Sequence, residues 1–264
     1  MPDDRTTADW QPDLYLRFKK ERTQPTIDLV TRIALAAPER VLDIGCGPGN
    51  STAVLRRTWP DAELFGLDSS ASMLARAKAS DASVTWVHQD ASQDMSFLGA
   101  FDLIFSNAAL QWIPDMRNVL PRLFGMLRPG GLLAVQSPYM LEMPIHDQAL
   151  RLTRQPEWKA HFPAPPEYPR HLPYTFYYDV LCALGGELTM WQTDYIHVMP
   201  GHEHVVGWYK GSGLRAFLDM LPTEALQEAF TAQYTKGIEQ AYPKERDNKV
   251  LLPYRRVFFL LYNR

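Results

Sequence analysis

The chain has 264 residues, of which 46% are hydrophobic and 22% are charged, a composition typical of globular proteins. This length suits one large domain with a sizeable core, and the formal net charge of −3 argues against nucleic acid as a partner. Two cysteines are too few for a disulfide framework, and we find neither an N-terminal leader pattern nor a run of about 18 apolar residues. We therefore expect a cytoplasmic protein without a membrane partner.

The first half of the chain alternates short apolar runs with helical patterns. The spacing over 28–37 predicts a helix that Pro38 ends. Beyond it we expect strands at 41–44, 63–67, 84–88, 102–105 and 131–136, and helices at 51–59, 71–79 and 117–127. Strands that alternate with helices in this way predict a doubly wound, mostly parallel α/β sheet covered on both faces.

The second half is rich in proline. The chain has 21 prolines against 15 glycines, and seven of the prolines lie between Pro144 and Pro173. Such a stretch is a poor helix and a poor central strand. Further on, a helix is expected at 177–184, strands at 187–198 and 251–262, and two or more helices within 203–239. We therefore expect seven strands in all, with a helical cap inserted before the last one.

A glycine-rich loop after the first strand carries the clearest chemical signal. Asp43 lies near the end of that strand, and Gly45, Gly47 and Gly49 follow at alternate positions before a helix. Such glycines let the backbone approach a ligand, and the helix N-terminus offers unpaired N–H groups. The spacing differs from the Gly-x-Gly-x-x-Gly dinucleotide fingerprint, and a carboxylate here suits an ammonium or sulfonium better than a pyrophosphate. A tight turn without a ligand is the structural alternative.

This loop and the segments after it resemble, in the same order, the motifs of class I S-adenosylmethionine-dependent methyltransferases, which have a Rossmann-like fold. Asp68 lies where that family binds the ribose hydroxyls, and Asp90 where it accepts from the adenine amino group. The resemblance implies S-adenosyl-L-methionine as the donor and S-adenosyl-L-homocysteine as the product. With Tyr15 and Arg22 from the N-terminal helix, the expected cofactor site comprises Tyr15, Arg22, Asp43, Gly45, Gly47, Gly49, Asp68, Ser69, Met73, Asp90, Ala91, Asn107, Ala108 and Trp112.

Within this class, the chain is most similar to the trans-aconitate 2-methyltransferase family over essentially its whole length. The likeness is carried by residues 9–12 with Tyr15, Phe18, Glu21 and Arg22, and by residues 47–52, 107–112, 195–200 and 213–215. The resemblance implies methylation of a carboxylate of trans-aconitate, a small polycarboxylate. We accordingly expect a single methyltransferase domain with an N-terminal helical lid (1–37), a cofactor-binding half (38–138), and the remaining sheet with a substrate cap (139–264).

The substrate site is expected to consist of cations rather than a general base. A carboxylate nucleophile is already ionised at neutral pH, so positioning and desolvation suffice, whereas its other carboxylates require arginines. We favour Arg215, which follows a helix break in the cap, and Arg255, which on a strand faces opposite to Arg256. Tyr195 and His197 are expected as neutral positioning groups. Further candidates are Arg22, Arg170, Arg256, Tyr15, His171 and Tyr254.

Other readings of the sequence stay open. A carboxyl methyltransferase acting on a carrier-bound dicarboxylate would need a basic docking face, and a non-catalytic module would bind S-adenosylmethionine without turnover. The 202–204 His-Glu-His motif lacks a third ligand at a recognisable spacing, so we expect no metal. The sequence does not decide between a monomer and an oligomer.

Overall fold

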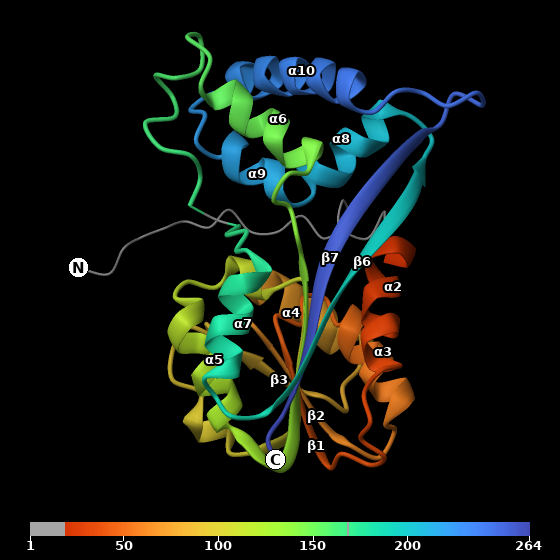
Figure 1. The fold of residues 1–264 in the computed structure, drawn as a ribbon, viewed down its shortest axis with the longest axis vertical. Coiled ribbons are helices and arrows are strands. Elements are labelled where there is room, and N and C mark those ends of the chain that lie inside the picture. Colours follow the sequence, from red (N-terminus) through yellow and green to blue (C-terminus); the bar gives the residue numbers. More distant parts are fainter. Residues whose placement is uncertain (1–18, 168) are drawn as a thin grey trace.

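A seven-stranded sheet forms the core of the computed structural model, which describes residues 19–167 and 169–264 (Figure 1). Its strands are β1 (Arg40–Ile44), β2 (Glu63–Asp68), β3 (Thr85–His88), β4 (Phe101–Asn107), β5 (Leu127–Pro138), β6 (Glu187–Met199) and β7 (Val250–Tyr262). Their order is β3-β2-β1-β4-β5-β7-β6; β1 to β5 pair in parallel, and β7 is antiparallel to both of its neighbours. The expected doubly wound, mostly parallel sheet is confirmed.

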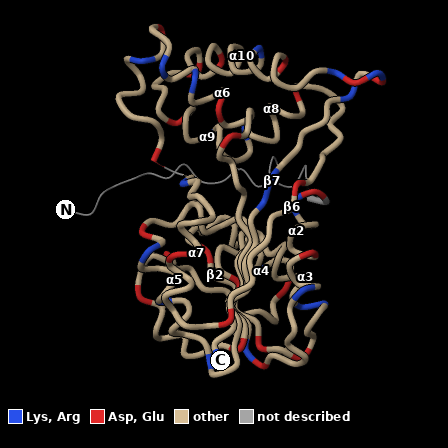
Figure 2. Tube along the Cα trace, viewed as in Figure 1, with Lys and Arg blue, Asp and Glu red and all other residues tan. Residues whose placement is uncertain are grey.

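Helices cover both faces of this sheet. On one face, α2 (Lys19–Val30) and α3 (Asn50–Thr58) pack through Leu29 and Leu55. On the other, α5 (Met116–Gly125) and α7 (Tyr174–Cys182) pack through Leu123 and Leu181. The remaining elements of this part are α4 (Ala71–Ser80) beside β2 and β3, and the short 3-10 turns η1 (Ser96–Leu98) and η2 (Leu110–Trp112). Charged residues lie mainly along the helices and loops around the sheet (Figure 2).

A second group of helices stands beyond one end of the sheet and is called the cap here (Figure 1). It comprises α6 (Pro144–Thr153), α8 (His202–Lys210), α9 (Gly213–Leu218) and α10 (Glu224–Ala241). The cap has an aromatic core of its own, in which Phe217, Phe230 and Tyr234 are almost fully buried. None of the described helices is long and apolar enough to cross a lipid bilayer.

The β6–β7 ribbon connects the sheet to the cap. These two strands pair along their whole lengths, from Glu187–Tyr262 to Met199–Val250. The neighbouring β5 pairs with β7 only as far as Arg256, opposite Pro138. The ribbon therefore continues past the point where the parallel strands end, and its free length carries the chain to α8 and back from α10.

Two expectations about helices are wrong. The first helix ends at Val30, not at residue 37, because side chains from elsewhere bind the backbone that follows: the Ala34 N–H donates to the Tyr262 hydroxyl (3.0 Å), and the Trp59 indole N–H donates to the Leu35 carbonyl (3.2 Å). The proline-rich segment also contains a helix. Pro144 stands at the first position of α6, where its missing N–H removes no helical hydrogen bond.

The cap has two origins in the chain. α8, α9 and α10 lie between β6 and β7, as expected of a cap inserted before the last strand. α6 instead comes from the segment directly after β5, and it packs against α10 and α9. The pairing of these distant segments depends on tertiary contacts that local sequence patterns do not report.

We predict that Phe230→Ala destabilises the protein through the core of the cap. Its ring packs edge-to-face on Trp158 (5.1 Å between centroids) and lies 5.5 Å from Phe162. Truncation leaves a cavity, which costs about 3–5 kcal/mol of unfolding free energy. Phe97→Ala is the matched control, since Phe97 is 67% exposed. Urea unfolding measures both variants, and equal effects would contradict a packed core in the cap.

Candidate active site

The glycine-rich loop between β1 and α3 bends sharply at the carboxyl edge of the sheet. Gly45 and Gly47 both adopt positive φ angles, 68° and 55°. A Cβ on Gly45 would lie 2.1 Å from the Cβ of Ala109, so a side chain has no room there. A Cβ on Gly47 would meet nothing within 4 Å. The loop therefore presents bare backbone to open space, where a ligand can approach closely.

Asp43 lies fully buried beneath this loop. Its Oδ2 accepts hydrogen bonds from the hydroxyls of Ser51 (2.7 Å) and Thr52 (2.6 Å) in the first turn of α3. Its Oδ1 is buried and has no hydrogen-bond partner among the described residues. Burial raises the pKa of Asp43 to about 7, although the two hydroxyls act in the opposite direction. A carboxylate oxygen in this state fits a ligand that brings a cation or an N–H group.

Asp68 connects the loop to the second strand. Its two oxygens accept from the backbone N–H groups of Gly47 and Ser70, both at 2.8 Å. Burial raises the pKa of Asp68, and these hydrogen bonds lower it. Because β1 and β2 are parallel neighbours, Asp43 and Asp68 end at the same edge of the sheet. The structure thus brings together the glycine loop and the two carboxylates, as the family resemblance implies.

The other predicted adenosine contacts surround this edge. Ser69 accepts at its carbonyl from the His88 ring (3.0 Å), and Met73 is buried in α4. Asp90 accepts from the Ser92 N–H (2.7 Å), so it stabilises a turn in the ligand-free chain. Ala91 beside it is buried, and Tyr15 lies outside the described residues. Cofactor contact by these residues stays a prediction.

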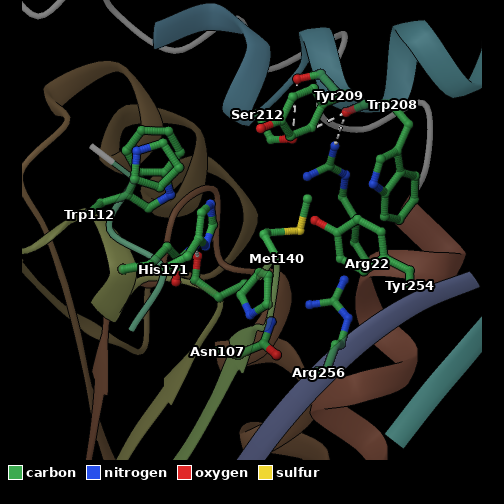
Figure 3. A pocket seen from close by; sticks show the side chains of 15 residues that line it. Arg22, Asn107, Trp112, Met140, His171, Trp208, Tyr209, Ser212, Tyr254 and Arg256 are labelled. Carbon is green, nitrogen blue, oxygen red and sulfur yellow. Dashed lines mark hydrogen bonds between the residues drawn. The ribbon is translucent and has the colours of Figure 1, made fainter. Parts of the chain in front are cut away.

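A pocket lies between the carboxyl edge of the sheet and the cap (Figure 3). Figure 3 shows Arg22 and Arg256 on one side of it and Trp112 and His171 on the other. Its walls come from helices α2, α8 and α9, from strand β7, from the β4–η2 segment and from the loop that precedes α7. The labelled lining residues are Arg22, Asn107, Trp112, Met140, His171, Trp208, Tyr209, Ser212, Tyr254 and Arg256.

Asn107 and Ala108 join this pocket to the glycine loop, because β4 pairs directly with β1. The backbone of Ala108 adopts a φ of 55°, which residues with a side chain rarely take, and its N–H donates to the Gln136 carbonyl (2.9 Å). The Oδ1 of Asn107 is buried and, within the described chain, accepts no hydrogen bond. These features place a strained turn and an available acceptor where the two parts of the site meet.

Two arginines face the pocket, and each lies over an aromatic ring. Arg256 is 3% exposed; its Nη1 donates to Oε1 of Gln136 (3.1 Å), and its guanidinium lies 5.0 Å from the Tyr254 ring centroid. Arg22 donates to the Trp208 carbonyl (3.3 Å) and lies 4.8 Å from that indole. Stacked guanidinium groups keep their planar, positively charged fork in one orientation. The pocket is therefore suited to anionic groups.

The partly buried His171 and the buried His197 are uncharged at neutral pH. Burial, together with the neighbouring His146, lowers the pKa of His171 to about 3. Burial and the positive charges of Arg256 and Arg22 lower the pKa of His197 to about 4. Neither histidine adds positive charge to the pocket at neutral pH, so its cations are the arginines.

The two favoured substrate arginines, Arg215 and Arg255, are not among the residues that line this pocket. Arg255 donates to both carboxylate oxygens of Asp194 (2.9 and 3.1 Å) on the opposite face of the ribbon. Arg215 forms an ion pair with Asp219 (3.4 Å) one turn along the chain and does not line the pocket. Strand alternation correctly required that only one of 255 and 256 face inward. It could not tell which one, because the cap and β5 determine the covered face.

Tyr195 and His197 lie behind the pocket rather than in its lining. The Tyr195 hydroxyl donates to Asp28 (2.5 Å), and burial together with this hydrogen bond raises the pKa of Tyr195. The His197 ring packs 4.7 Å from the Trp208 ring. The sequence did not single out Trp208 or Tyr209. Both belong to a helix whose buried face looks like any packed core, so local patterns give no signal for them.

The described residues contain no group of three metal-ligating side chains close enough to hold an ion. In the 202–204 motif, His202 bonds to the Tyr242 carbonyl (2.7 Å) and His204 to the Glu203 carboxylate (2.8 Å). These contacts give the motif structural partners.

The fold and the loop place the chain among methyltransferases. A methyltransferase domain family matches residues 41–131. Similar solved structures include the YcgJ protein from Bacillus subtilis, with a TM-score of 0.61, 14% identity and coverage of 90% of this chain and 97% of that one. A putative methyltransferase from Bacillus halodurans gives a TM-score of 0.59, 15% identity and coverage of 90% and 98%. At this identity the two structures support the fold alone.

Similarity over nearly the full length narrows the class to one family. The trans-aconitate 2-methyltransferase of Methylobacterium nodulans is 42% identical over 254 residues, which cover 96% of this chain and 98% of that one. That of Escherichia coli K12 is 39% identical over 253 residues, with coverage of 96% and 98%. The chain belongs to the trans-aconitate 2-methyltransferase family.

We predict that Asp43→Asn changes how stability depends on pH. The folded-state pKa of about 7 exceeds the ordinary value of 3.8, so folding takes up a proton at intermediate pH. Wild-type stability should therefore fall relative to the variant as pH rises through this range, by about 1.4 kcal/mol per unit of pKa shift. Urea unfolding from about pH 5 to about pH 8 measures the difference. A difference independent of pH would contradict the raised pKa.

Proposed function

We propose that this protein transfers the methyl group of S-adenosyl-L-methionine to a carboxylate of trans-aconitate, forming a monomethyl ester and S-adenosyl-L-homocysteine. The observation that carries the proposal is the buried Arg256, which faces a pocket next to the glycine loop. A buried guanidinium at such a pocket is suited to a carboxylate. The names of the relatives support trans-aconitate as the particular polycarboxylate.

The residues around the loop fit the cofactor. When bound, S-adenosyl-L-methionine supplies a methyl group on a positively charged sulfur. Asp43 offers a buried oxygen that lacks a partner in the described chain, and Gly47 offers backbone beside open space. We assign Asp68 and Asp90 to the ribose and the adenine. Arg22 is assigned to the carboxylate of the cofactor, which places the two arginines beside the two anionic groups that must be held together.

In the proposed reaction the protein orients the substrate and excludes water from the site, and it transfers no proton. A carboxylate with a reference pKa near 4 is ionised at neutral pH, so no base need remove a proton. Arg256 holds a carboxylate of the substrate, and the rings of Trp112, Trp208 and Tyr254 exclude water around it. In a site without water, opposite charges attract more strongly, and the nucleophile is less solvated. Positioning of this kind supplies the rate enhancement.

The setting that we propose is the reducing cytoplasm, with a small-molecule substrate alone. Cys46 is buried in the glycine loop and Cys182 is exposed, and both are free thiols. Neither side chain is needed by the proposed reaction. The division into lid, cofactor half and substrate cap is part of the same proposal, with the cap supplying Trp208 and Tyr209 to the pocket.

We predict that the purified protein methylates trans-aconitate and that Arg256→Met loses most of this activity. The loss of a buried cation that holds an anion should lower kcat/KM about 100-fold or more, equivalent to about 3 kcal/mol. Radiolabelled methyl transfer over a panel of dicarboxylates and tricarboxylates measures it.

Arg255→Met is the matched comparison, because the neighbouring guanidinium binds Asp194 instead of facing the pocket. It should change kcat/KM by less than about threefold, as expected for an exposed ion pair. Inactivity of the wild type toward every acid would reject the proposed substrate class. Equal losses in both variants would reject the role of Arg256.

We predict that cofactor binding is linked to the titration of Asp43. A cation beside Asp43 favours its charged form, so binding lowers the pKa from about 7 and releases a proton. Affinity for S-adenosyl-L-homocysteine should therefore rise with pH by up to about tenfold per unit below neutrality. Isothermal titration from about pH 5.5 to about pH 7 measures this slope. Asp43→Asn should bind more weakly with a flat profile, and an unchanged slope would contradict the contact.

A further inference from the structure

We propose that Gln136 is a positioning residue for the substrate: its side-chain amide aims the guanidinium of Arg256 into the pocket without placing a negative charge beside it. The inference rests on the proposed function, because it acts through the assignment of Arg256 to a carboxylate of the substrate.

Gln136 lies fully buried near the carboxyl end of β5. It stands in register with Asn107 on β4 and Phe258 on β7, so it occupies the row that leads from the glycine loop to the ribbon. Its Oε1 accepts from Nη1 of Arg256 at 3.1 Å. Since Arg256 is paired with Pro138, the last residue of β5, this contact comes from the strand that stops where the pocket begins.

The fold itself does not explain this amide. Nε2 of Gln136 is buried and finds no acceptor in the described part of the chain, and Oδ1 of its register neighbour Asn107 finds no donor there. A buried donor that makes no hydrogen bond costs free energy, so an apolar side chain of similar size would serve the sheet as well or better. The amide can turn only one end toward a guanidinium, its oxygen, because the NH₂ group is itself a donor. Among the described residues, that oxygen accepts from Arg256.

The adjacent arginine shows the other way to hold a guanidinium. Arg255 donates hydrogen bonds to both oxygens of the Asp194 carboxylate. Such a partner occupies the fork of the guanidinium and offsets its charge, which suits a structural pair. The amide oxygen of Gln136 instead accepts one N–H of Arg256 and carries no net charge. On two successive residues of β7, the inward one has the partner that preserves attraction for an anion.

Two variants of Gln136 test this role. Gln136→Glu keeps the shape and adds a negative charge that competes with the substrate for Arg256. Gln136→Met keeps the approximate size and removes the acceptor. We expect Gln136→Glu to raise KM for trans-aconitate at least about tenfold with kcat changed less than about threefold, and Gln136→Met to raise it less, about threefold or more. The affinity for S-adenosyl-L-homocysteine, measured by isothermal titration, should be the same in both variants as in the wild type.

Thermal unfolding separates positioning from packing. Gln136→Met removes an unsatisfied buried donor but also the acceptor of the Arg256 Nη1, and because these two effects oppose each other its unfolding temperature should stay close to that of the wild type. Asp194→Asn is the control for disturbing the neighbouring arginine, and its KM should match the wild type. An unchanged KM in Gln136→Glu beside normal wild-type turnover would overturn the role of Gln136 alone. So would a lowered unfolding temperature in both Gln136 variants with unchanged KM. Absence of wild-type turnover would overturn the proposed function, and this role with it.

Discussion

The antiparallel insertion of β7 between β5 and β6 is the constraint on which the site depends. β5 ends opposite Arg256, whereas β6 and β7 stay paired beyond that point, as far as Met199 and Val250 near the cap. This difference in length opens a space at the carboxyl edge of the parallel strands and sets the cap helices above it. The ribbon thereby fixes the distance between a loop built on β1 and the aromatic residues of α8. Without the ribbon, the pocket would keep the residues at the edge of the sheet but would lose those that α8 and α9 supply.

Two buried charges of opposite sign lie at this edge, and each bears a cost for the ligand-free fold. Asp43 is buried with its pKa raised to about 7, and Arg256 is almost fully covered. Burial of ionised groups is unfavourable unless partners compensate for the lost water. Ser51 and Thr52 supply uncharged hydrogen-bond partners to Asp43, and Gln136 supplies one to Arg256. The fold thus orients its charges and keeps them for ligands, at some expense of stability.

Local patterns in the sequence were sufficient for the sheet and the loop, but not for the pocket. Each strand was expected within a few residues, because buried strands such as β1 and β4 are short apolar runs in the sequence. The end of α2 was missed because Tyr262, far along the chain, binds the backbone beyond it. The sequence analysis preferred Arg255 over Arg256 because strand alternation places the two on opposite faces but does not say which face the rest of the protein covers. Gln136 passed unnoticed because it lies within a strand that reads as core.

The electrostatics of the pocket also show why a whole-chain charge is a poor guide to the ligand. A net charge of −3 suggests no preference for an anion, yet the groups that face the pocket include two guanidiniums. Those guanidiniums in turn help to keep His197 neutral, so the positive charge is confined to residues that cannot lose a proton near neutral pH. A site whose cations do not titrate binds a carboxylate equally well over a broad pH range. The pH dependence of the complete site must then come from the carboxylates on the side of the glycine loop, where burial raises the pKa of Asp68 and brings that of Asp43 to about 7.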